Sequence, residues 1–289
     1  MGANQSAESS ALEALAKLRG SPCPVLAPGE VWLVGAGPGD PGLLTLDALA
    51  GILQADVILY DALVNSGLLD RAREDAEKVF VGKRGGQPST SQDTINELLL
   101  KSAVRGKRVV RLKSGDPFLF ARGGEEMLAL AAAGVPCRAI PGITSGLAAL
   151  ACAAIPATLR KVNQAVVLAT GHVTDDQESS NWIEFLKRGV PIVFYMGLRN
   201  LQSILTKLIE GGIPATLPAA VIASATLPEQ GIVVATLTDL PAEAEAAHLQ
   251  GPAVVVVGEI VRVRSELLKL ASDLQPRATQ LAPHLNCYA

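Results

Sequence analysis

The sequence predicts an α/β protein with two domains in tandem, and three observations support this fold class. Short runs of Val, Ile and Leu alternate with helical patterns along the 289 residues. In the first half the apolar runs are continuous, which is typical of strands buried on both faces of a parallel sheet. In the second half two runs lie too close together for a helical crossover, which indicates a hairpin within a mixed sheet.

The first predicted domain covers residues 31–142 and follows a lead-in, residues 1–30, which we expect to be poorly ordered except for a short helix over 9–19. Ser91 is the expected N-cap of one helix, and Gly106 is expected to end that helix. The strands of this domain are predicted at 31–35, 56–60, 78–82, 108–112 and 137–140, and its helices at 45–54, 91–104 and 123–133.

The second predicted domain covers residues 143–272 and is followed by a tail, residues 273–289. The boundary is expected near 142–163, where Pro and Gly interrupt an Ala-rich segment. The expected hairpin joins the third and fourth strands of this domain. Its strands are predicted at 165–170, 190–195, 219–223, 231–236 and 253–258, and its helices at 181–188, 199–210 and 260–272.

Composition and charge narrow the classes of protein to which the chain can belong. It is 49% hydrophobic and 18% charged, so it can bury a large core. Its net charge of -3 is unlike that of a general nucleic-acid binder, which is usually basic. Four dispersed Cys and three dispersed His indicate reduced thiols and no metal site. With no long apolar run and no signal peptide, we expect a cytoplasmic protein without a membrane span.

A glycine-rich loop, residues 34–42, follows the first predicted strand and lets the backbone approach a ligand closely. One interpretation is a dinucleotide site, with Asp61 in the place of a ribose-binding acid about 20 residues on. Pro38 and Pro41 oppose it because each removes an amide donor, and the next helix begins only near Thr45. The alternative interpretation is a tight turn that binds no ligand.

Charged residues follow the ends of several predicted strands, where open α/β sheets bind ligands. Asp61 and Lys83 each come just after such a strand, and Asp116 lies in the turn after another. Arg122 and Glu125 come at the start of the next helix. An arginine there opposes the helix dipole, so we interpret Arg122 as a functional residue rather than a stabilising one.

Basic residues also follow the predicted strand ends, although the whole chain is acidic. A basic crevice on an acidic protein indicates a small substrate with several negative charges. Small residues over 141–157 permit the close approach of a bulky ligand. The basic residues concerned are Lys83, Arg84, Arg111, Lys113, Arg122, Arg160 and Lys161.

Together these segments resemble the class III, or tetrapyrrole, methylase family, and within it the uroporphyrinogen-III C-methyltransferases. The similar stretches occur in one order from about residue 31 to 264, which makes the resemblance far more specific than the glycine loop alone. They are VGAGPGDPGLLTL, VGKRGG, RVVRLKSGDPFLFARGGEE, PGITSG, VFYMGL and PAVVVVGEIV.

The resemblance implies two αβα domains, a homodimer, and S-adenosylmethionine bound in an interdomain cleft, with S-adenosylhomocysteine as a product and no metal. It assigns Asp61 and Lys83 as proton acceptor and donor, and it gives Arg122 a catalytic or substrate-binding role. Glu125 and Arg160 are implied to bind substrate, and we add Lys113 because of its charge. The implied cofactor contacts are Pro38, Ser114, Gly115, Asp116, Leu119, Thr144, Ser145, Met196, Ala225 and Ala253.

The sequence departs from the family pattern at three positions. Ser114 and Ala121 stand where the family usually has Gly, and Leu159 stands where it usually has His. The serine adds a side chain beside the implied cofactor site, and the missing histidine argues against a histidine-dependent step there. No fused dehydrogenase–ferrochelatase domain is expected, so the chain should only methylate.

The implied reaction is the methylation of uroporphyrinogen III at C2 and C7 to give precorrin-2, a precursor for sirohaem and cobalamin. Asp61 is a reasonable proton acceptor, Lys83 could accept a proton only when neutral, and Arg122 almost never deprotonates, so the identity of the base stays open. Three alternatives also remain: a corrin-ring methyltransferase, the ribosomal-RNA methyltransferase branch that the acidic charge disfavours, and a non-catalytic nucleotide-binding module.

Overall fold

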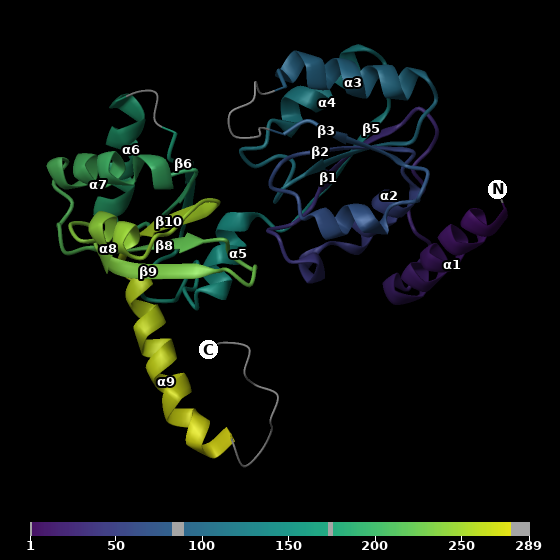
Figure 1. Cartoon of the computed structure of the whole chain (residues 1–289). Helices are drawn as coiled ribbons and strands as arrows, with labels where there is room; N and C mark the ends of the chain where they lie inside the picture. Colours follow the sequence, from purple (N-terminus) through teal and green to yellow (C-terminus); the bar gives the residue numbers. More distant parts are fainter. Residues whose placement is uncertain (1, 83–89, 173–175, 279–289) are drawn as a thin grey trace. The chain divides into compact units, whose positions relative to one another are not determined.

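The computed structural model describes residues 2–82, 90–172 and 176–278. The chain divides into a first unit, Met1–Ser145, and a second unit, Gly146–Ala289, and each unit contains one five-stranded sheet with helices packed on it (Figure 1). The predicted α/β class is therefore confirmed. The units meet at residues 145 and 146, close to the boundary that the sequence predicted between 142 and 143.

The sheet of the first unit is entirely parallel, as the continuously apolar runs predicted. Its strands lie in the order β3-β2-β4-β1-β5, so every carboxyl end meets the same edge. Each strand lies within two residues of its predicted bounds. The strands are β1 (Val31–Gly35), β2 (Val57–Tyr60), β3 (Glu77–Phe80), β4 (Val109–Lys113) and β5 (Cys137–Ile140).

Helices cover both faces of this sheet, and the period of two along β1 decides which side chain meets which helix. Trp32 and Val34 pack towards α2 (Leu46–Gln54), whereas Val31 and Leu33 pack towards α3 (Gln92–Val104) and α4 (Gly123–Ala132). Figure 1 shows α3 and α4 on one side of the sheet and α2 on the other. The apolar strands thus lie between two layers of helices.

The helix starts and stops follow local capping chemistry. The hydroxyl of Ser91 accepts a hydrogen bond from the Thr94 N–H at 3.1 Å, which confirms the predicted cap of α3. Gly106, just past α3, has a φ of +72°, a left-handed conformation that favours glycine. Thr45 caps α2, so this helix begins after the glycine-rich loop as predicted. A short 3₁₀ turn, Pro41–Leu43, fills the interval.

The first nineteen residues differ from the prediction of a poorly ordered lead-in. Helix α1 spans Gly2–Arg19, rather than only 9–19, and its residue Leu15 is buried. The helix packs against α2, and Arg19 Nε lies 2.8 Å from Asp47 Oδ1. A buried leucine and an ion pair to a neighbouring helix stabilise a segment whose own propensity is unremarkable.

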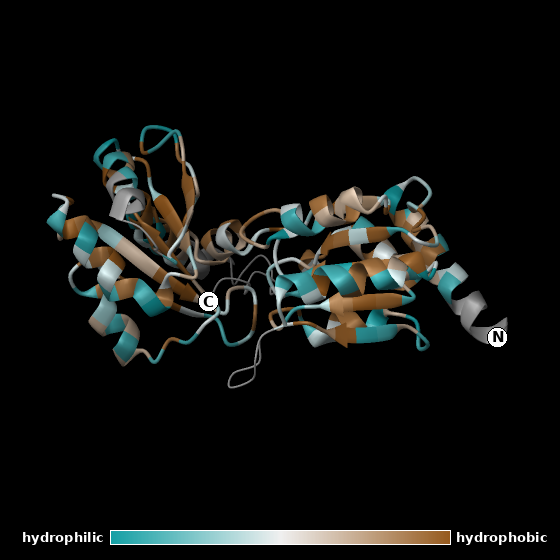
Figure 2. Cartoon of the chain, turned by 90° about the horizontal axis from the view of Figure 1, so that it is seen from above, coloured by the Kyte–Doolittle hydropathy of each residue, from teal (hydrophilic) through white to brown (hydrophobic). Residues whose placement is uncertain are grey.

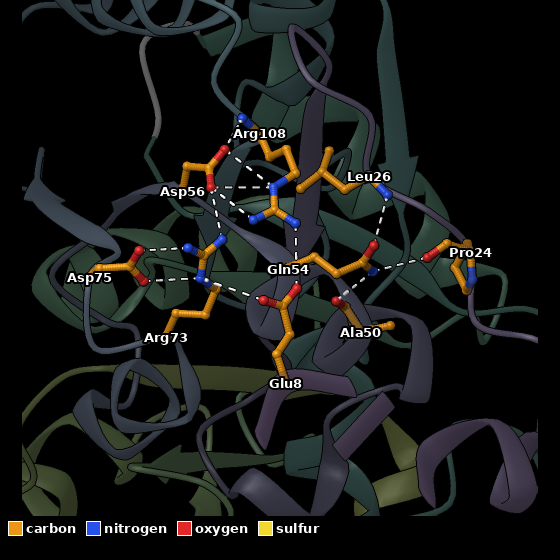
Figure 3. A network of polar contacts seen from close by, with 9 residues as sticks. All are labelled: Glu8, Pro24, Leu26, Ala50, Gln54, Asp56, Arg73, Asp75 and Arg108. Carbon is orange, nitrogen blue, oxygen red and sulfur yellow. Dashed lines mark hydrogen bonds and ion pairs between the residues drawn. The ribbon is translucent and has the colours of Figure 1, made fainter. Parts of the chain in front are cut away.

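The chain between α1 and β1 is held by the side chain of Gln54, which is only 5% exposed. Its amide nitrogen donates to the Pro24 carbonyl at 2.9 Å and to the Ala50 carbonyl at 2.8 Å. Its amide oxygen accepts from the Leu26 N–H at 3.1 Å (Figure 3). Two of these three hydrogen bonds join the N-terminal segment to α2, and the third, to Ala50, lies within the helix.

Five charged residues form an ionic cluster at the amino end of the first sheet, which we name the amino-end network (Figure 3). Asp56 precedes β2, and Arg108 precedes β4. Asp56 Oδ1 accepts from Arg108 Nη2 at 2.8 Å and from Arg73 Nη1 at 3.0 Å, and Asp56 Oδ2 accepts from the Arg108 N–H at 2.8 Å. Glu8 of α1 completes the network through pairs with Arg73 and Arg108, and Asp75 through a pair with Arg73.

The sheet of the second unit is mixed, with the order β6-β7-β10-β8-β9. Only β6 and β7 pair in parallel, and β8 and β9 form the predicted antiparallel hairpin. The strands are β6 (Val167–Thr170), β7 (Ile192–Tyr195), β8 (Pro218–Ala223), β9 (Gly231–Thr236) and β10 (Ala253–Val257). The predicted mixed sheet is therefore confirmed.

The helices of the second unit are α5 (Ser145–Cys152), α6 (Asp176–Lys187), α7 (Leu201–Glu210), α8 (Leu240–Ala246) and α9 (Val263–Ala278). The sequence did not predict α5 and α8, which are short and rich in alanine. Helix α9 extends into the predicted tail, and in Figure 1 it runs away from the sheet of this unit. Three further 3₁₀ turns occur in the two units: Ser66–Arg71, Leu198–Asn200 and Glu259–Arg262.

The core of the second unit lies between its sheet and helices α6, α7 and α8. Phe194 of β7 is fully buried there and meets Trp182 of α6 edge to face, with ring centroids 4.8 Å apart. Figure 2 shows hydrophobic strands and helices with hydrophilic outer stretches in both units. Each unit therefore has a core of its own.

Candidate functional site

The glycine-rich loop and the turn after β4 pair with each other at the carboxyl end of the first sheet. The Gly115 N–H donates to the Gly37 carbonyl at 2.7 Å, and the Gly37 N–H donates to the Gly115 carbonyl at 3.2 Å. A β-carbon on Gly35 or Gly142 would collide with the backbone at Gly115 and with the other glycine. The ends of β1, β4 and β5 therefore meet backbone to backbone, because only glycine permits that approach.

Asp116, predicted to contact a cofactor, uses both of its carboxylate oxygens within this turn. Oδ1 accepts from the Phe118 N–H at 2.8 Å, and Oδ2 accepts from the Gly142 N–H at 3.2 Å. The side chain thus holds the turn after β4 to the segment after β5.

Asp61 directly follows β2, at the same edge of the sheet. Its Oδ1 accepts from Arg111 Nη2 at 2.6 Å, and its side chain is 30% exposed. Among the described residues, no hydrogen bond reaches Oδ2 of Asp61. Lys83, its predicted partner in proton transfer, lies outside the described residues, as does Arg84.

Asp61 belongs to a cluster of five polar residues that we name the carboxyl-end network: Asp61, Gln92, Arg111, Lys113 and Glu126. Arg111 and Lys113 are two positions apart in β4, so both point to the face covered by α3 and α4. Each side chain is 2% exposed, and that of Glu126 is 0% exposed. Glu126 Oε1 accepts from Lys113 Nζ at 2.9 Å, from Arg111 Nε at 3.1 Å and from Gln92 Nε2 at 3.2 Å.

Burial and the neighbouring charges shift the pKa of Lys113. Removal from water lowers the pKa of Lys113, and the nearby Arg111 charge lowers it further, while the charge and hydrogen bond of Glu126 oppose both effects. The predicted contact of Lys113 with substrate is not supported by this arrangement, because its ammonium is buried and bonded to Glu126.

The sequence predicted that the basic residues follow the strand ends and line a crevice, and this prediction needs correction at Arg111 and Lys113. Arg111 and Lys113 lie inside strand β4, where both faces are buried. A charge within an apolar strand requires a buried partner, and the second glutamate of GGEE supplies it. The sequence pattern VVRLK could have revealed this, because an apolar strand covered on both faces leaves its charged residues no exposed side.

Arg122 and Glu125 lie at the exposed start of α4, as predicted, and they form an ion pair there. Arg122 Nε donates to Glu125 Oε1 at 2.9 Å, and the two side chains are 56% and 55% exposed. The hydrogen bond raises the pKa of Arg122 and lowers the pKa of Glu125. Arg122 has a φ of +60°, so a strained backbone presents a solvent-accessible guanidinium at this edge.

Three predicted site residues of the second unit gather at one end of its sheet. Met196 directly follows β7, Ala225 comes two residues after β8, and Ala253 begins the antiparallel β10. In the strand register Val254 of β10 pairs with Tyr195 of β7, and Ala253 pairs with Ala223 of β8. The register therefore places these residues at the same edge.

Left-handed backbone conformations concentrate at the predicted site residues. The described chain has eight residues other than glycine with positive φ, and six are predicted site residues or lie within two positions of one. Such conformations cost about 1–3 kcal/mol each and cluster at functional sites in proteins. No pattern in the sequence predicted these conformations. The six are Phe120, Arg122, Lys161, Met196, Ser224 and Thr226.

The remaining predicted residues lie on loops. Pro38 and Leu119 are half-buried in the first unit, and Thr144 and Ser145 lead into α5. Arg160 is exposed in a turn of the second unit, in which Asn163 Oδ1 accepts from the Leu159 N–H at 3.0 Å. The first unit thus brings together Pro38, Asp61, Ser114, Gly115, Asp116 and Thr144 at its sheet edge, and the second brings together Met196, Ala225 and Ala253.

No group of three or more His, Cys, Asp or Glu in the described ranges is placed to hold a metal ion. Among the described helices, none is both long enough and apolar enough to cross a membrane.

The chain matches the family model described as Tetrapyrrole (Corrin/Porphyrin) Methylases over residues 30–241. It is 49% identical to a uroporphyrinogen-III C-methyltransferase of Sinorhizobium over 243 residues, which cover 83% of this chain and 87% of the relative. It is 47% identical to siroheme synthase of Azotobacter vinelandii over 86% of this chain. The match spans only 53% of that siroheme synthase, so the chain corresponds to about half of its length.

Solved structures show the same fold. The uroporphyrin-III C-methyltransferase of Thermus thermophilus, complexed with S-adenosylhomocysteine, has a TM-score of 0.68 and 37% identity, and the match covers 81% of this chain and 99% of that one. Cobalt precorrin-4 methyltransferase has a TM-score of 0.73 and 27% identity, with 81% and 96% covered. Both matches extend over nearly the whole of the solved chain.

Proposed function

We propose that this chain, which belongs to the tetrapyrrole methylase family, transfers methyl groups from S-adenosylmethionine to C2 and C7 of uroporphyrinogen III to give precorrin-2. The observation that carries the substrate is the match to the Sinorhizobium enzyme at 49% identity over most of both chains. Family membership supports the reaction class, and the geometry of the two sheet edges supports the positions of the site residues.

The residues present fit the proposed methyl donor. S-adenosylmethionine combines an adenosine, an amino-acid tail and a sulfonium, so it needs backbone polar groups and space rather than anion-binding arginines. The first unit offers the backbones of 114–116 and the loop at Pro38, without side chains between the strand ends. The second unit offers the left-handed backbones at Met196 and beside Ala225. These segments, with Leu119, Thr144, Ser145 and Ala253, are the proposed cofactor contacts.

When bound, S-adenosylmethionine supplies a methyl group on a positively charged sulfur, which is an activated electrophile. The residues of this chain must then orient the electron-rich ring carbon, exclude water and accept one proton, because the ring gains a positive charge when the carbon–carbon bond forms. Alignment of this kind supplies several kcal/mol, within an upper range of about 7–11 kcal/mol.

We assign the orienting role to Arg122, with Glu125 fixing its side chain, and to Arg160. The substrate carries acetate and propionate carboxylates, and a guanidinium binds a carboxylate through two parallel hydrogen bonds. Arg122 and Arg160 are both exposed, which leaves them accessible to such groups. Asp61 is the proposed proton acceptor, and Lys83 stays the predicted donor.

The decisive experiment is anaerobic incubation with S-adenosylmethionine and uroporphyrinogen III, followed by the absorption spectrum and the product mass. We expect a gain of two methyl groups, accompanied by a change in the absorption spectrum. No mass gain in a sample that binds S-adenosylhomocysteine would refute the proposed substrate.

A corrin-ring substrate is the second candidate, because cobalt precorrin-4 methyltransferase has the higher TM-score, 0.73 against 0.68. The higher identity to the uroporphyrin enzyme, 37% against 27%, favours uroporphyrinogen III. Competition between uroporphyrinogen III and a cobalt-precorrin under one assay distinguishes the two, since the true substrate gives the larger kcat/KM.

A non-catalytic nucleotide-binding module is separated by thermal shift. S-adenosylhomocysteine at 100 times its Kd stabilises the folded state by about 2.7 kcal/mol, whereas NAD(H) should leave the Tm unchanged. The reverse result would favour the binding module. A homodimer, a cytoplasmic location and the absence of a nucleic-acid partner stay predictions from the sequence.

A further inference from the structure

We infer that Arg111, held in place by Glu126, is a positioning residue for the proposed proton acceptor Asp61. This inference rests on the proposed function and adds a residue that the resemblance did not implicate. Arg111 lies inside β4 and Glu126 in the first turn of α4, and neither is placed to meet a bulky substrate, because their side chains are 2% and 0% exposed.

The guanidinium of Arg111 has a fixed orientation, because several of its donors are used. Nε donates to Glu126 Oε1 at 3.1 Å, and Nη1 donates to the Leu112 carbonyl at 3.3 Å. Nη2 is then directed at Asp61 Oδ1, 2.6 Å away. A planar guanidinium bound on two sides cannot rotate without breaking these bonds, so the position of Asp61 is set from inside the protein.

Asp61 is held through one of its carboxylate oxygens, Oδ1. Its side chain is 30% exposed at the sheet edge, and no described group donates to Oδ2. A carboxylate fixed in this way can face a ring that gains positive charge during methylation, and it can accept a hydrogen bond or a proton without first reorganising. Arg111 thereby acts on the reaction through Asp61.

Stability alone does not account for the network. Buried ion clusters contribute little net stability relative to well-packed apolar residues of similar volume, because the charges lose their water. Oε2 of Glu126 is also buried without a hydrogen-bond partner in the described structure, which adds to the cost. A costly buried charge pair that ends on an accessible carboxylate is better explained by positioning than by packing.

A double-mutant cycle tests the inference on the full-length chain. Arg111→Lys keeps the charge but loses the fork that reaches Asp61 and Glu126 together. We expect kcat to fall by about 10- to 100-fold in the wild-type background, from misplacement of Asp61. In the Asp61→Asn background the same substitution should change kcat by less than about 2-fold, because the group that it positions has been removed. S-adenosylhomocysteine affinity should be unchanged throughout.

Arg108→Lys is the matched control, because Arg108 directly precedes β4 and also pairs with an aspartate beside β2, but at the amino end. It should leave kcat unchanged. Equal losses from Arg111→Lys in both backgrounds would overturn the inference and assign Arg111 a structural role. Glu126→Gln should show the same coupling to Asp61, which covers the case in which Arg111→Lys does not fold.

The wild-type measurement separates the two levels of the argument. Wild-type turnover of uroporphyrinogen III with no coupling would overturn the positioning role alone. The absence of wild-type turnover would overturn both the proposed function and this inference.

Discussion

The two ends of the first sheet use the same pair of residues for different purposes. At each end an aspartate beside β2 binds an arginine of the β4 segment: Asp56 with Arg108 at the amino end, and Asp61 with Arg111 at the carboxyl end. Asp56 accepts hydrogen bonds at both of its oxygens, whereas Asp61 accepts one at Oδ1 alone among the described residues.

The exposure of the arginine and the aspartate also differs between the two ends. The arginine and the aspartate of the amino-end pair are each about one fifth exposed, at 21% and 22%. At the carboxyl end Arg111 is buried, and Asp61 reaches the surface. At the amino end, an aspartate that accepts at both oxygens fastens the strands and α1 together through partly exposed arginines. At the carboxyl end, a buried arginine holds an aspartate that has one oxygen without a hydrogen bond among the described residues, which suits a site. The number of free acceptors distinguishes the two roles better than the type of residue does.

The largest predicted difference between the ends is in stability. Glu126→Ala leaves Lys113 buried without its bonded counter-charge and leaves Arg111 with Asp61 alone, so the free energy of unfolding should fall by about 3–5 kcal/mol. Asp56→Ala should cost only about 1–2 kcal/mol, because water reaches the arginines that it leaves behind. Urea unfolding of both variants measures the difference. Equal losses would show that burial does not separate the two networks.

Catalysis should respond at the carboxyl end alone. Arg122→Ala should lower kcat/KM by about 100-fold or more and leave S-adenosylhomocysteine binding intact, because we propose that the lost guanidinium binds substrate rather than cofactor. Arg108→Gln, at the amino end, should leave kcat/KM unchanged. Steady-state kinetics and calorimetry measure the two effects. An equal loss of cofactor affinity in Arg122→Ala would contradict the assignment.

The smallest predicted difference is in the pH dependence of stability. Burial lowers the pKa of Lys113 below its ordinary 10.5, so between the lowered value and 10.5 the unfolded state binds more protons. Stability should therefore rise with pH across this window in the wild type relative to Lys113→Met. Urea unfolding at several alkaline pH values measures it, and parallel curves would contradict the shift.

The amino end provides the acid counterpart. A hydrogen bond from Arg73 lowers the pKa of Asp75 below 3.8, so the stability that Asp75 contributes is present above 3.8 and is lost as the pH falls through the lowered value. In Asp75→Asn this acid loss should be absent, and the alkaline difference at Lys113 should persist.

The sequence predicted the first sheet well because its strands are continuous apolar runs between capped helices. Ser91, Gly106 and Thr45 behave as local chemistry requires, so the starts and ends of their helices were accessible from sequence. Helix α1 was predicted too short because its stability comes from Leu15 and Glu8 meeting residues far along the chain. Tertiary contacts of this kind leave no periodic pattern.

The site was predicted in its strand-end positions and missed in its interior. Asp61, Arg122 and Glu125 lie where strand ends and helix starts placed them. Glu126 was not among the predicted site residues, but it is the buried partner of Arg111 and Lys113. That role depends on how α4 lies against β4, which no short sequence window contains. Left-handed conformations at Met196 and Ser224 were equally inaccessible, because neither residue type favours them.

The bonds of Gln54 bear on how this protein should be shortened for experiments. The matched family region begins at residue 30, so deletion of everything before it looks harmless from an alignment. Such a deletion would strip Gln54 of its partners at Pro24 and Leu26, and it would uncover the arginines that bind Glu8. The safer place to cut lies before Glu8, because the residues from Glu8 onward carry the interactions that join the N-terminal segment to the sheet.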